Sequence, residues 1–466
     1  MRTVSITGER PLTTADLERL GALPREVMDA AQAIVDDVRA RGDEAVREYC
    51  LRFDGACPSS LLVPREVVDG ACDMVDPQFL EALRRAHAQV RDFHERQRQD
   101  SWFTTRPDGT ILGAKVSAVS SAGVYVPGGR AQYPSTVIMD VVPAKVAGVE
   151  RIVMVTPPQK DGSLSAYTLA AASVAGVDEV YAVGGAQAIG ALAYGTESIP
   201  RVDKIVGPGN AFVAAAKSYV SGDVGIDMVA GPSEVCVLAD ATADPVVVAA
   251  DLMAQAEHDP MATCYLVTCD AELALEVDAA IERLVAQSPR EEITRTSLDH
   301  GIIVVADALD VAVDAVNLIA PEHLELHCAD AMGLLGAIKN AGAIFVGAWS
   351  SEPLGDYVAG PNHTLPTGGT AAFSNPLGVY DFQKHSSVIC YTPAGLAADA
   401  PATQVMAQAE GLWAHALSAG LRRKLAEQGT ERFDDPVAAC ADAMSTAWPQ
   451  TLVEPGVPNI GGMEGE

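Results

Sequence analysis

The sequence predicts an α/β protein with two Rossmann-like, doubly wound parallel-sheet domains and smaller helical parts towards both ends of the chain. From Gly113 onward, short β-branched runs that end in glycine or proline alternate with helices rich in small residues. A second series of the same kind follows Ile226. The 466 residues are 48% hydrophobic and only 20% charged, so the chain can bury two cores.

The first series predicts strands that each end in a tight turn and lead into a helix about every thirty residues. Its strand segments are SAVSSAGVYVPGG, RIVMVTPP, EVYAVGG and KIVGPGN. The second series contains the strands ATCYLVT, GIIVVAD and AIFVGAW, separated by the helical segments VVVAADLMAQAEH, ELALEVDAAIERLVAQ and DVAVDAVNLI. Because strand and helix alternate throughout, both sheets are expected to be parallel.

Helical periodicity covers residues 25–97, and a second amphipathic helical segment lies towards the C-terminus. The stretch 351–376 is rich in glycine, proline and threonine and has no periodicity, which predicts a long functional loop. The expected organisation is an N-terminal extension (1–25), a first α/β domain (26–124 with 233–376), a second (125–232), a helical C-terminal part (377–445) and a disordered tail (446–466).

Charge and cysteine usage exclude several classes of protein. The 32 basic and 62 acidic residues give a net charge of −30, which repels nucleic acid and anionic membrane surfaces. The nine cysteines include no C-x-x-C pair, so neither a disulfide framework nor a thiolate zinc site is expected. The N-terminus lacks an apolar signal region, and no run is apolar over the ~20 residues of a membrane helix. We therefore expect a cytoplasmic protein.

Gln255 and His258 are three residues apart at the end of a predicted helix, before Pro260, and share a face. A polar helix end explains this pair alone better than a ligand pair does, since glutamine is an uncommon zinc ligand. Together with Asp356 and His415, however, they form a set that suits a divalent metal, with zinc as the first choice.

The segment 320–327, APEHLELH, resembles a helix start, because proline and glutamate favour the first turn. The adjacent Glu322 and His323 could serve as two separate proton handlers, since successive helical side chains point about 100° apart. His327 is a competing candidate for the base. Asp356 and His363 are predicted to lie in the irregular loop, whereas His415, among Ala, Leu and Trp, reads alone as a packed core residue.

Glycine turns offer a weak indication of a nucleotide. Gly207-Pro208-Gly209-Asn210 lacks the third glycine of the dinucleotide fingerprint, and Gly184-Gly185 is a tight turn after a strand. Such turns at the carboxyl ends of strands often bind phosphates, but glycines that serve only helix–strand packing are equally compatible.

Several motifs in order carry a resemblance to a known family. They are VYVPGG with YPSTV, VGGAQAIGALA, KIVGPGNAFVAAAK, IDMVAGPSEV, QAEHDPMA, PEHLEL, GDYVAGPNHTLPT and EGLWAHA. From about residue 25 to residue 440 the chain closely resembles the histidinol dehydrogenases. The terminal extensions fall outside the resemblance. The resemblance implies the aldehyde dehydrogenase and histidinol dehydrogenase type of fold.

The resemblance implies oxidation of L-histidinol through bound L-histidinal to L-histidine, with two NAD and one zinc ion per subunit, as the last step of histidine biosynthesis. The implied zinc ligands are Gln255, His258, Asp356 and His415. Glu322 and His323 would handle protons. Substrate contacts would come from the zinc ligands and from His323, Ser233, His363 and Glu410. NAD contacts would come from Tyr125, Gln187 and Asn210, with NAD held loosely because the usual fingerprint is missing.

The family also forms homodimers in which the C-terminal part is swapped, so Glu410 and His415 would complete the neighbour's pocket. Relatives that oxidise other small alcohols, such as a sulfonated diol, would need a cation in place of these two residues. A zinc hydrolase could use the same metal set, with Glu322 activating water, but the two α/β domains and the GPGN turn weigh against it. A bilobal binding protein would not require Glu322 and His323 beside a metal.

Overall fold

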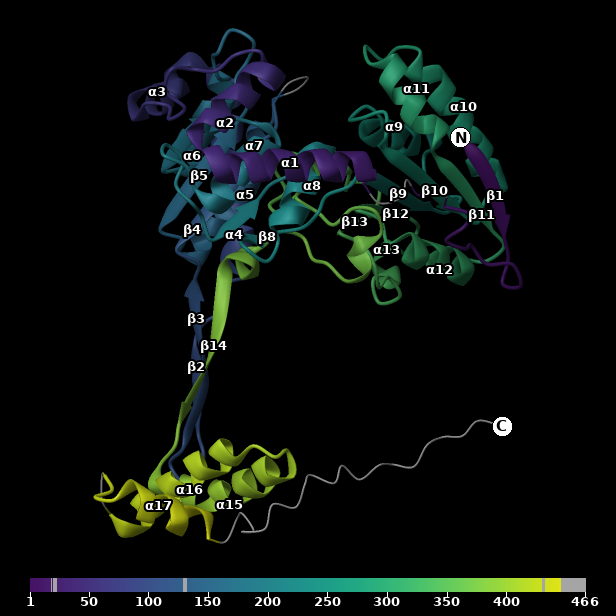
Figure 1. Cartoon of the computed structure of the whole chain (residues 1–466). Helices are drawn as coiled ribbons and strands as arrows, with labels where there is room; N and C mark the ends of the chain where they lie inside the picture. Colours follow the sequence, from purple (N-terminus) through teal and green to yellow (C-terminus); the bar gives the residue numbers. More distant parts are fainter. Residues whose placement is uncertain (18, 20–22, 129–131, 430–431, 446–466) are drawn as a thin grey trace. The chain divides into compact units, whose positions relative to one another are not determined.

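A computed structural model of the chain describes residues 1–17, 19, 23–128, 132–429 and 432–445. The chain divides into two compact units. Unit 1 comprises Met1–Arg98 and Ala118–Lys384, and unit 2 comprises Gln99–Ser117 with the chain from His385 onward. Unit 1 contains two parallel sheets flanked by helices, which confirms the predicted α/β class (Figure 1).

The first parallel sheet has the strand order β6-β5-β4-β7-β8. Its strands are β4 (Ser121–Tyr125), β5 (Arg151–Thr156), β6 (Glu179–Ala182), β7 (Lys204–Val206) and β8 (Gly225–Ile226). Every pair is parallel. The chain runs outward from β4 in one direction and then returns to add β7 and β8 on the other side. This is a doubly wound sheet whose order reverses between β4 and β7.

Helices rich in small residues cover this sheet: α5 (Pro134–Ala147), α6 (Ala166–Ala175), α7 (Gly185–Tyr194) and α8 (Ala211–Val220). The N-terminal helical region packs here too. It contains α1 (Arg25–Arg41), α2 (Asp43–Tyr49), a π-helical turn (Cys50–Asp54), α3 (Arg65–Gly70), a 3-10 turn (Ala71–Met74) and α4 (Pro77–Glu95).

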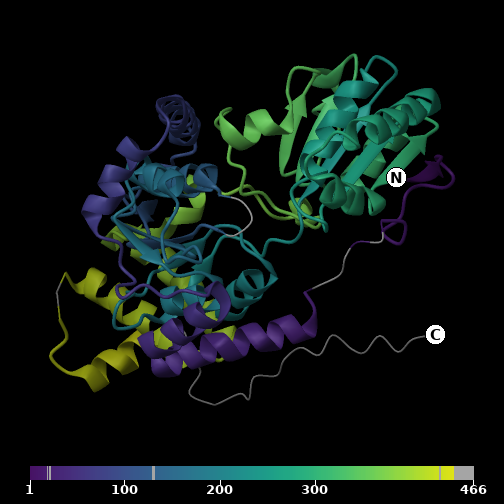
Figure 2. The same cartoon turned by 90° about the horizontal axis from the view of Figure 1, so that it is seen from above.

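The placement of α1 differs from the expected organisation, which grouped 26–124 with 233–376. α1 lies along α7 and α8 (Figure 2). A Cβ on Gly190 of α7 would lie 3.3 Å from the Val38 side chain and 3.4 Å from the Val35 Cα, so glycine allows this close helix approach. Helical periodicity shows that α1 has an apolar face but not which sheet that face covers.

The second parallel sheet has the order β1-β11-β10-β9-β12-β13. Its strands are β1 (Arg2–Ile6), β9 (Glu234–Ala239), β10 (Thr263–Thr268), β11 (Ile302–Ala306), β12 (His323–His327) and β13 (Ala343–Val346). All pairs are parallel. The N-terminal extension therefore has a structural role, since β1 forms one edge of the sheet beside β11 (Figure 1).

Helices cover both faces of the second sheet. α9 (Pro245–Ala256), α10 (Ala271–Val285) and α11 (Glu291–Asp299) pack on one face, and α12 (Leu309–Ile319) and α13 (Ala331–Leu334) pack on the other. The apolar residues of β9 alternate between the two cores: Val235 and Val237 face α9, while Cys236 and Leu238 face α12. These elements correspond to the second strand–helix series in the sequence and to the 233–376 part of the expected first α/β domain.

One predicted helix is wrong. The segment PEHLELH does not start a helix but forms β12, paired with β9 on one side and β13 on the other. The non-glycine residue Ala320 takes a φ of 43° where α12 ends. Leu324 and Leu326 then point into the core under α12, so the period-two alternation outweighs the helix-start pattern of Pro321 and Glu322.

The stretch 351–376 is less irregular than expected. It contains α14 (Glu352–Tyr357) and a 3-10 turn (Thr370–Ala372), and a further 3-10 turn follows (Val379–Phe382). Asp356 therefore lies on a helix rather than in a loop, and the expectation for this residue is wrong. His363 does lie in non-helical chain, as predicted.

Unit 2 combines a three-stranded sheet, in the order β14-β3-β2, with helices. Its elements are β2 (Trp102–Thr105), β3 (Ile111–Ala118), β14 (Gln383–Cys390), α15 (Pro393–Ala409), α16 (Trp413–Gln428) and α17 (Pro436–Met444). Ala407, Ala416 and Met444 form a small buried cluster. The tail expected at 446–466 lies outside the described residues. Among the helices described here, none has the length and apolar character needed to cross a membrane.

Candidate active site

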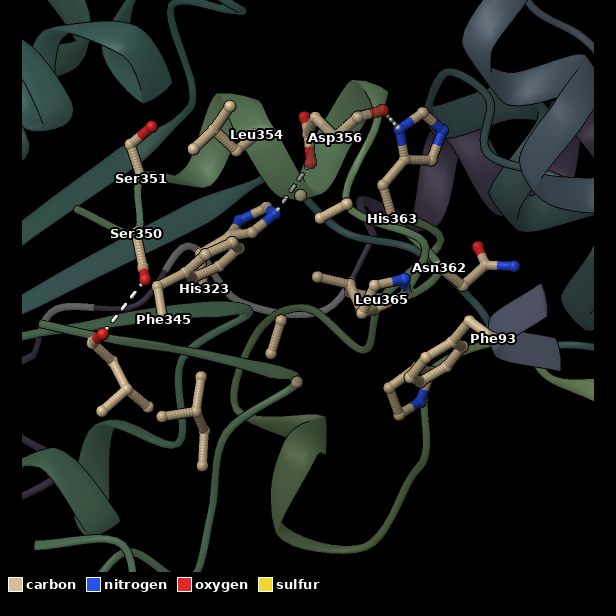
Figure 3. Close-up of a pocket in the computed structure, with 18 of the residues that line it drawn as sticks. Phe93, His323, Phe345, Ser350, Ser351, Leu354, Asp356, Asn362, His363 and Leu365 are labelled. Atoms are coloured by element: carbon tan, nitrogen blue, oxygen red, sulfur yellow. Dashed lines mark hydrogen bonds and ion pairs between the residues drawn. The ribbon is translucent and has the colours of Figure 1, made fainter. Parts of the chain in front are cut away.

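A pocket of about 510 Å³ opens in unit 1 at the amino ends of β12 and β13. His323, Asp356 and His363 line it together with apolar side chains that include Phe345 and Leu354 (Figure 3). The surrounding elements are β13, α14, the chain that follows α14, and the end of α4. The pocket thus combines convergent polar groups with an apolar wall, as ligand sites commonly do.

His323 is the first residue of β12 and is buried. Its Nε2 lies 3.4 Å from Asp356 Oδ1, and its Nδ1 lies 3.3 Å from the main-chain oxygen of Glu234. Glu322, just before the strand, accepts the Glu234 N–H through Oε2 at 2.9 Å. The same oxygen is 3.8 Å from His323 Nδ1. The predicted carboxylate–imidazole pair is therefore present, but on a strand end.

The electrostatics of this pair follow from burial and from nearby carboxylates. Burial raises the pKa of Glu322 to about 7. Burial alone would lower the pKa of His323, but Glu322, Asp356 and Glu352 outweigh it and raise that pKa to about 10. Several carboxylates around one imidazole create a site that favours cations.

A metal-type cluster adjoins the pocket through Asp356. Ligand atoms of His258, Glu352 and Asp356 all lie within 4.8 Å of one another. Gln255, in the last turn of α9, places its Nε2 3.2 Å from His258 Nδ1, and its buried Oε1 has no hydrogen-bond partner among the described residues. Oxygen and nitrogen donors this close together fit a divalent ion such as zinc.

Glu352 was not predicted. It and Asp356 are four residues apart and so share a face of α14, but this spacing carries meaning only once the segment is known to be helical. α14 can approach β13 because its Gly355 has no side chain: a Cβ there would lie 2.6 Å from the Phe345 ring. This close packing brings the carboxylates of α14 to the end of β12.

The chain after α14 is anchored on α5. His363 Nδ1 lies 3.0 Å from the main-chain oxygen of Asp356, and its Nε2 lies 3.3 Å from Thr136 Oγ1. Asn362 donates to the Met139 carbonyl at 2.6 Å. His363 is thus held against the domain of the five-stranded sheet. Ser233, just before β9, lies at the same amino edge of the other sheet as His323.

The competing base, His327, lies at the other end of β12, outside the pocket. Its Nε2 lies 3.4 Å from Asp251 Oδ2 and 3.4 Å from Glu325 Oε2, and all three side chains are buried. His327 is not among the residues that line the pocket. Of the two imidazoles on β12, His323 is therefore the one placed to meet a substrate.

The candidate NAD residues lie near the carboxyl edge of the five-stranded sheet. Tyr125 ends β4, and its hydroxyl accepts the Gly185 N–H at 3.1 Å. Gln187 is buried, and neither atom of its amide has a hydrogen-bond partner among the described residues. Asn210 caps α8 by accepting from Phe212 N at 3.0 Å. This edge, where the strand order reverses between β4 and β7, is the usual nucleotide position in doubly wound sheets.

Comparison with known proteins agrees with this geometry. The model of the histidinol dehydrogenase family matches residues 18–423. The chain belongs to the histidinol dehydrogenase family. Histidinol dehydrogenase of Bacillus subtilis (strain 168) is 51% identical over 91% of this chain and 99% of its own length. That of Geobacillus kaustophilus (strain HTA426) is 52% identical over 86% of this chain and 94% of its own.

The fold agrees as well. The crystal structure of histidinol dehydrogenase from Elizabethkingia anophelis matches with a TM-score of 0.86 and 33% identity, covering 91% of this chain and 98% of that one. The histidinol dehydrogenase fold expected from the sequence is therefore confirmed. As a member of this family the chain is an oxidoreductase.

Two of the residues implied by the histidinol dehydrogenase resemblance belong to a different unit from the other implied zinc ligands. Glu410 and His415 belong to unit 2, at the end of α15 and in the first turn of α16. Gln255, His258 and Asp356 belong to unit 1. Both Glu410 and His415 are exposed, so the interpretation of His415 as a packed core residue is wrong. An exposed imidazole remains available for a ligand.

The Gly207 turn is held by a buried ion pair. Gly207 has a φ of 110°, and a Cβ there would lie 2.2 Å from the Tyr125 carbonyl oxygen, so the position requires glycine. Lys217 donates to the Gly207 carbonyl at 2.8 Å and pairs with Asp227 at 2.5 Å. Asp227 in turn accepts the Gly207 N–H at 2.8 Å. The buried side chains of Lys217 and Asp227 thus hydrogen-bond the carbonyl and the N–H of Gly207.

Lys217→Met is expected to lower the free energy of unfolding by about 3–5 kcal/mol, because it leaves the Asp227 carboxylate buried and unpaired. Urea unfolding followed by circular dichroism measures the loss. The double variant Lys217→Met with Asp227→Asn removes the uncompensated charge and should recover part of it. Equal stability of Lys217→Met and the parent chain would contradict the role given to this ion pair.

Proposed function

We propose that this chain is an L-histidinol dehydrogenase, which oxidises L-histidinol through bound L-histidinal to L-histidine with two NAD, the last step of histidine biosynthesis. The observation that carries the proposal is His323 at the pocket, with Glu322 3.8 Å away and the His258–Glu352–Asp356 cluster beside it, in a chain of this family. A zinc hydrolase would leave the nucleotide-type edge of the five-stranded sheet unused. A binding protein would need no proton-handling pair.

Two side chains would handle the protons. His323 presents Nε2 to the pocket, where it would accept the proton of the alcohol and, in the second oxidation, that of the hydrate. Glu322 would activate water for addition to the aldehyde. A carboxyl whose pKa is about 7 can take up and return a proton near neutral pH.

For the metal we propose zinc, held by Gln255, His258, Asp356 and, from a second copy of the chain, His415. The unpartnered Gln255 oxygen and the close ligand atoms of His258 and Asp356 support this set. When bound, zinc would orient the substrate through its amino and imidazole nitrogens and offset the carboxylate charge beside His323. Ser233, His363 and Glu410 would contact the substrate directly.

NAD is proposed to bind at the carboxyl edge of the five-stranded sheet, with contacts from Tyr125, Gln187 and Asn210. The buried Gln187 amide, which has no partner among the described residues, supports this placement. When bound, NAD accepts the hydride. Because Gly207-Pro208-Gly209 lacks the third glycine of the fingerprint, the protein would hold NAD without the usual pyrophosphate turn.

We further propose a homodimer in which Glu410 and His415 complete the pocket of the second copy. Their exposure in unit 2 supports this arrangement. We also place the enzyme in the cytoplasm. Its nine cysteines form no disulfides, which suits a reducing compartment.

Purified chain supplied with zinc, NAD and L-histidinol is expected to form two NADH for each L-histidine, because the alcohol is oxidised twice. Absorbance at the NADH band together with chromatographic quantification of histidine gives the ratio. Turnover of another small alcohol but not of histidinol would sink the substrate assignment. Product without NADH would favour the hydrolase.

Mixing two inactive variants tests the swapped dimer. After the His323→Ala and His415→Ala chains are unfolded together and refolded, about half the dimers should be mixed, each with one intact site, which restores about a quarter of the parent activity. Each variant refolded alone is the control. If the mixture stays as inactive as its components, His415 does not act in the neighbouring site.

A further inference from the structure

A second layer of ionisable side chains lies behind the active site. His323, Glu325 and His327 alternate along β12 and point to one face of the sheet. In register they neighbour Val235, Val237 and Ala239 of β9, the residues that pack beneath α9. A central strand therefore carries a polar stripe on a face where its neighbour is apolar. Only the first residue of this stripe, His323, lines the pocket.

The deeper part of the stripe meets α9. His327 Nε2 lies 3.4 Å from both Asp251 Oδ2 and Glu325 Oε2. Asp251 precedes Gln255 by one helical turn, so both lie on the same face of α9. Asp251 is 7% exposed, Glu325 0% and His327 4%. The buried triad thus ties β12 to the helix that carries the Gln255 amide.

Glu325 also ties the triad to α14. Its Oε1 accepts the Glu352 N–H at 2.7 Å, at the first residue of the helix whose next turn carries Asp356. One carboxylate therefore contacts His327 with one oxygen and the start of α14 with the other. Through β12, the triad connects α9 to α14, the two helices that supply Gln255 and Asp356.

Stability alone does not account for this triad. Two carboxylates and an imidazole pay a desolvation cost in the core, and apolar residues of similar volume are often as stable or more so. The 3.4 Å contacts are ion-pair distances, and Glu325 Oε2, Asp251 Oδ2 and both His327 ring nitrogens make no hydrogen bond among the described residues. The better explanation is that the triad holds its elements in a defined position, since paired charges restrict how the strand and the helices that bear them can be placed relative to one another.

We propose that Asp251, Glu325 and His327 are positioning residues that set the spacing between Gln255 on α9 and Asp356 on α14, and thereby the zinc affinity of the active site. The inference rests on the zinc site of the proposed function. None of the three contacts substrate. Their effect acts through the backbone of α14 and through α9.

The test is the zinc affinity of the full-length enzyme, measured by competition with a chromophoric chelator. Glu325→Ala is expected to weaken zinc binding about 10–100-fold, as loss of outer-shell partners of metal ligands does. Glu325→Gln, which keeps an acceptor for the Glu352 N–H, should recover part of the affinity. The matched control is Thr268→Val, which removes another buried polar contact of the same sheet, the one to Asp270 N at 3.0 Å, and should leave zinc affinity unchanged.

Further readouts separate positioning from simple destabilisation. Thermal unfolding of the metal-free variants reports stability, and excess zinc should restore NADH turnover to Glu325→Ala if only the affinity has fallen. If Glu325→Ala fails to fold, Glu325→Gln and Asp251→Asn, which preserve volume, decide the question by the same zinc competition. A loss of affinity in these two variants supports the inference.

Three results would count against it. Parent chain that binds no zinc overturns the proposed zinc site itself, and the inference falls with it. Parent chain that binds zinc, with the Glu325 and Asp251 variants binding equally well, overturns the inference alone. Two zinc ions per parent chain, one of them lost in Glu325→Ala, would show that the triad is itself a metal site and would also overturn it.

Discussion

Replacing His323 by alanine is expected to lower the turnover of L-histidinol about 10²–10⁴-fold, the usual loss when a general base is removed. His323 is the imidazole of β12 that lines the pocket, with Nε2 3.4 Å from Asp356 and Nδ1 facing the Glu234 carbonyl. No other imidazole on this strand can replace it, because His327 is buried between Asp251 and Glu325. Steady-state NADH formation at saturating histidinol and NAD measures kcat.

The zinc content of His323→Ala should equal that of the parent chain, since the proposed ligands are intact. His300→Ala is the control for loss of an imidazole, because His300 is an exposed residue at the end of α11. A near-normal rate for His323→Ala would remove His323 from the mechanism. The base would then have to be sought at His327, despite its burial.

His258→Ala is expected to release the zinc and, with it, the activity. His258 supplies the nitrogen donor in the cluster with Glu352 and Asp356, and its ring adjoins the Gln255 amide at 3.2 Å. Removal of this donor leaves Gln255, Asp356 and His415 as the proposed ligands, one fewer than the four that zinc commonly takes in a protein site. Elemental analysis after dialysis should fall from about one zinc per parent subunit to a small fraction of that.

Glu257→Ala serves as the matched control for this experiment. Glu257 is the exposed neighbour of His258 and is not part of the ligand cluster, so its loss changes local charge without removing a ligand. The variant should keep its zinc. Full zinc retention in His258→Ala would contradict the ligand assignment, whatever happens to the activity.

Much of the fold could be read from local patterns. Four strands of the five-stranded sheet, β4 to β7, are followed within two residues by glycine or proline, and the helix after each carries small residues on the side that packs against strands. These features are local, because turn geometry and helix packing depend on residues close together in the chain. The parallel, doubly wound character of both sheets followed from them.

The errors arose where distant contacts outweigh local preference. Pro321 and Glu322 favour a helix start, yet β9 and β13 flank the next five residues and make them a strand. The stretch after Ser351 lacks periodicity, yet packing of Gly355 against Phe345 accommodates a short helix. Sequence spacing alone could not show that Glu352 and Asp356 share a helical face.

The sequence by itself determined the α/β class, most of the strand–helix alternation and, through its motifs, the set of residues that the family uses. Only the tertiary structure decided how those residues are arranged. Pairing of β12 with β9 and β13 places His323 at the pocket end of the strand and His327 at the buried end, and packing of α14 adds Glu352 to the cluster. The scattered pair Gln255 and His258 joins Asp356 because α9 and α14 meet beside β12. These outcomes depend on contacts between segments far apart in the chain, which residue spacing does not encode.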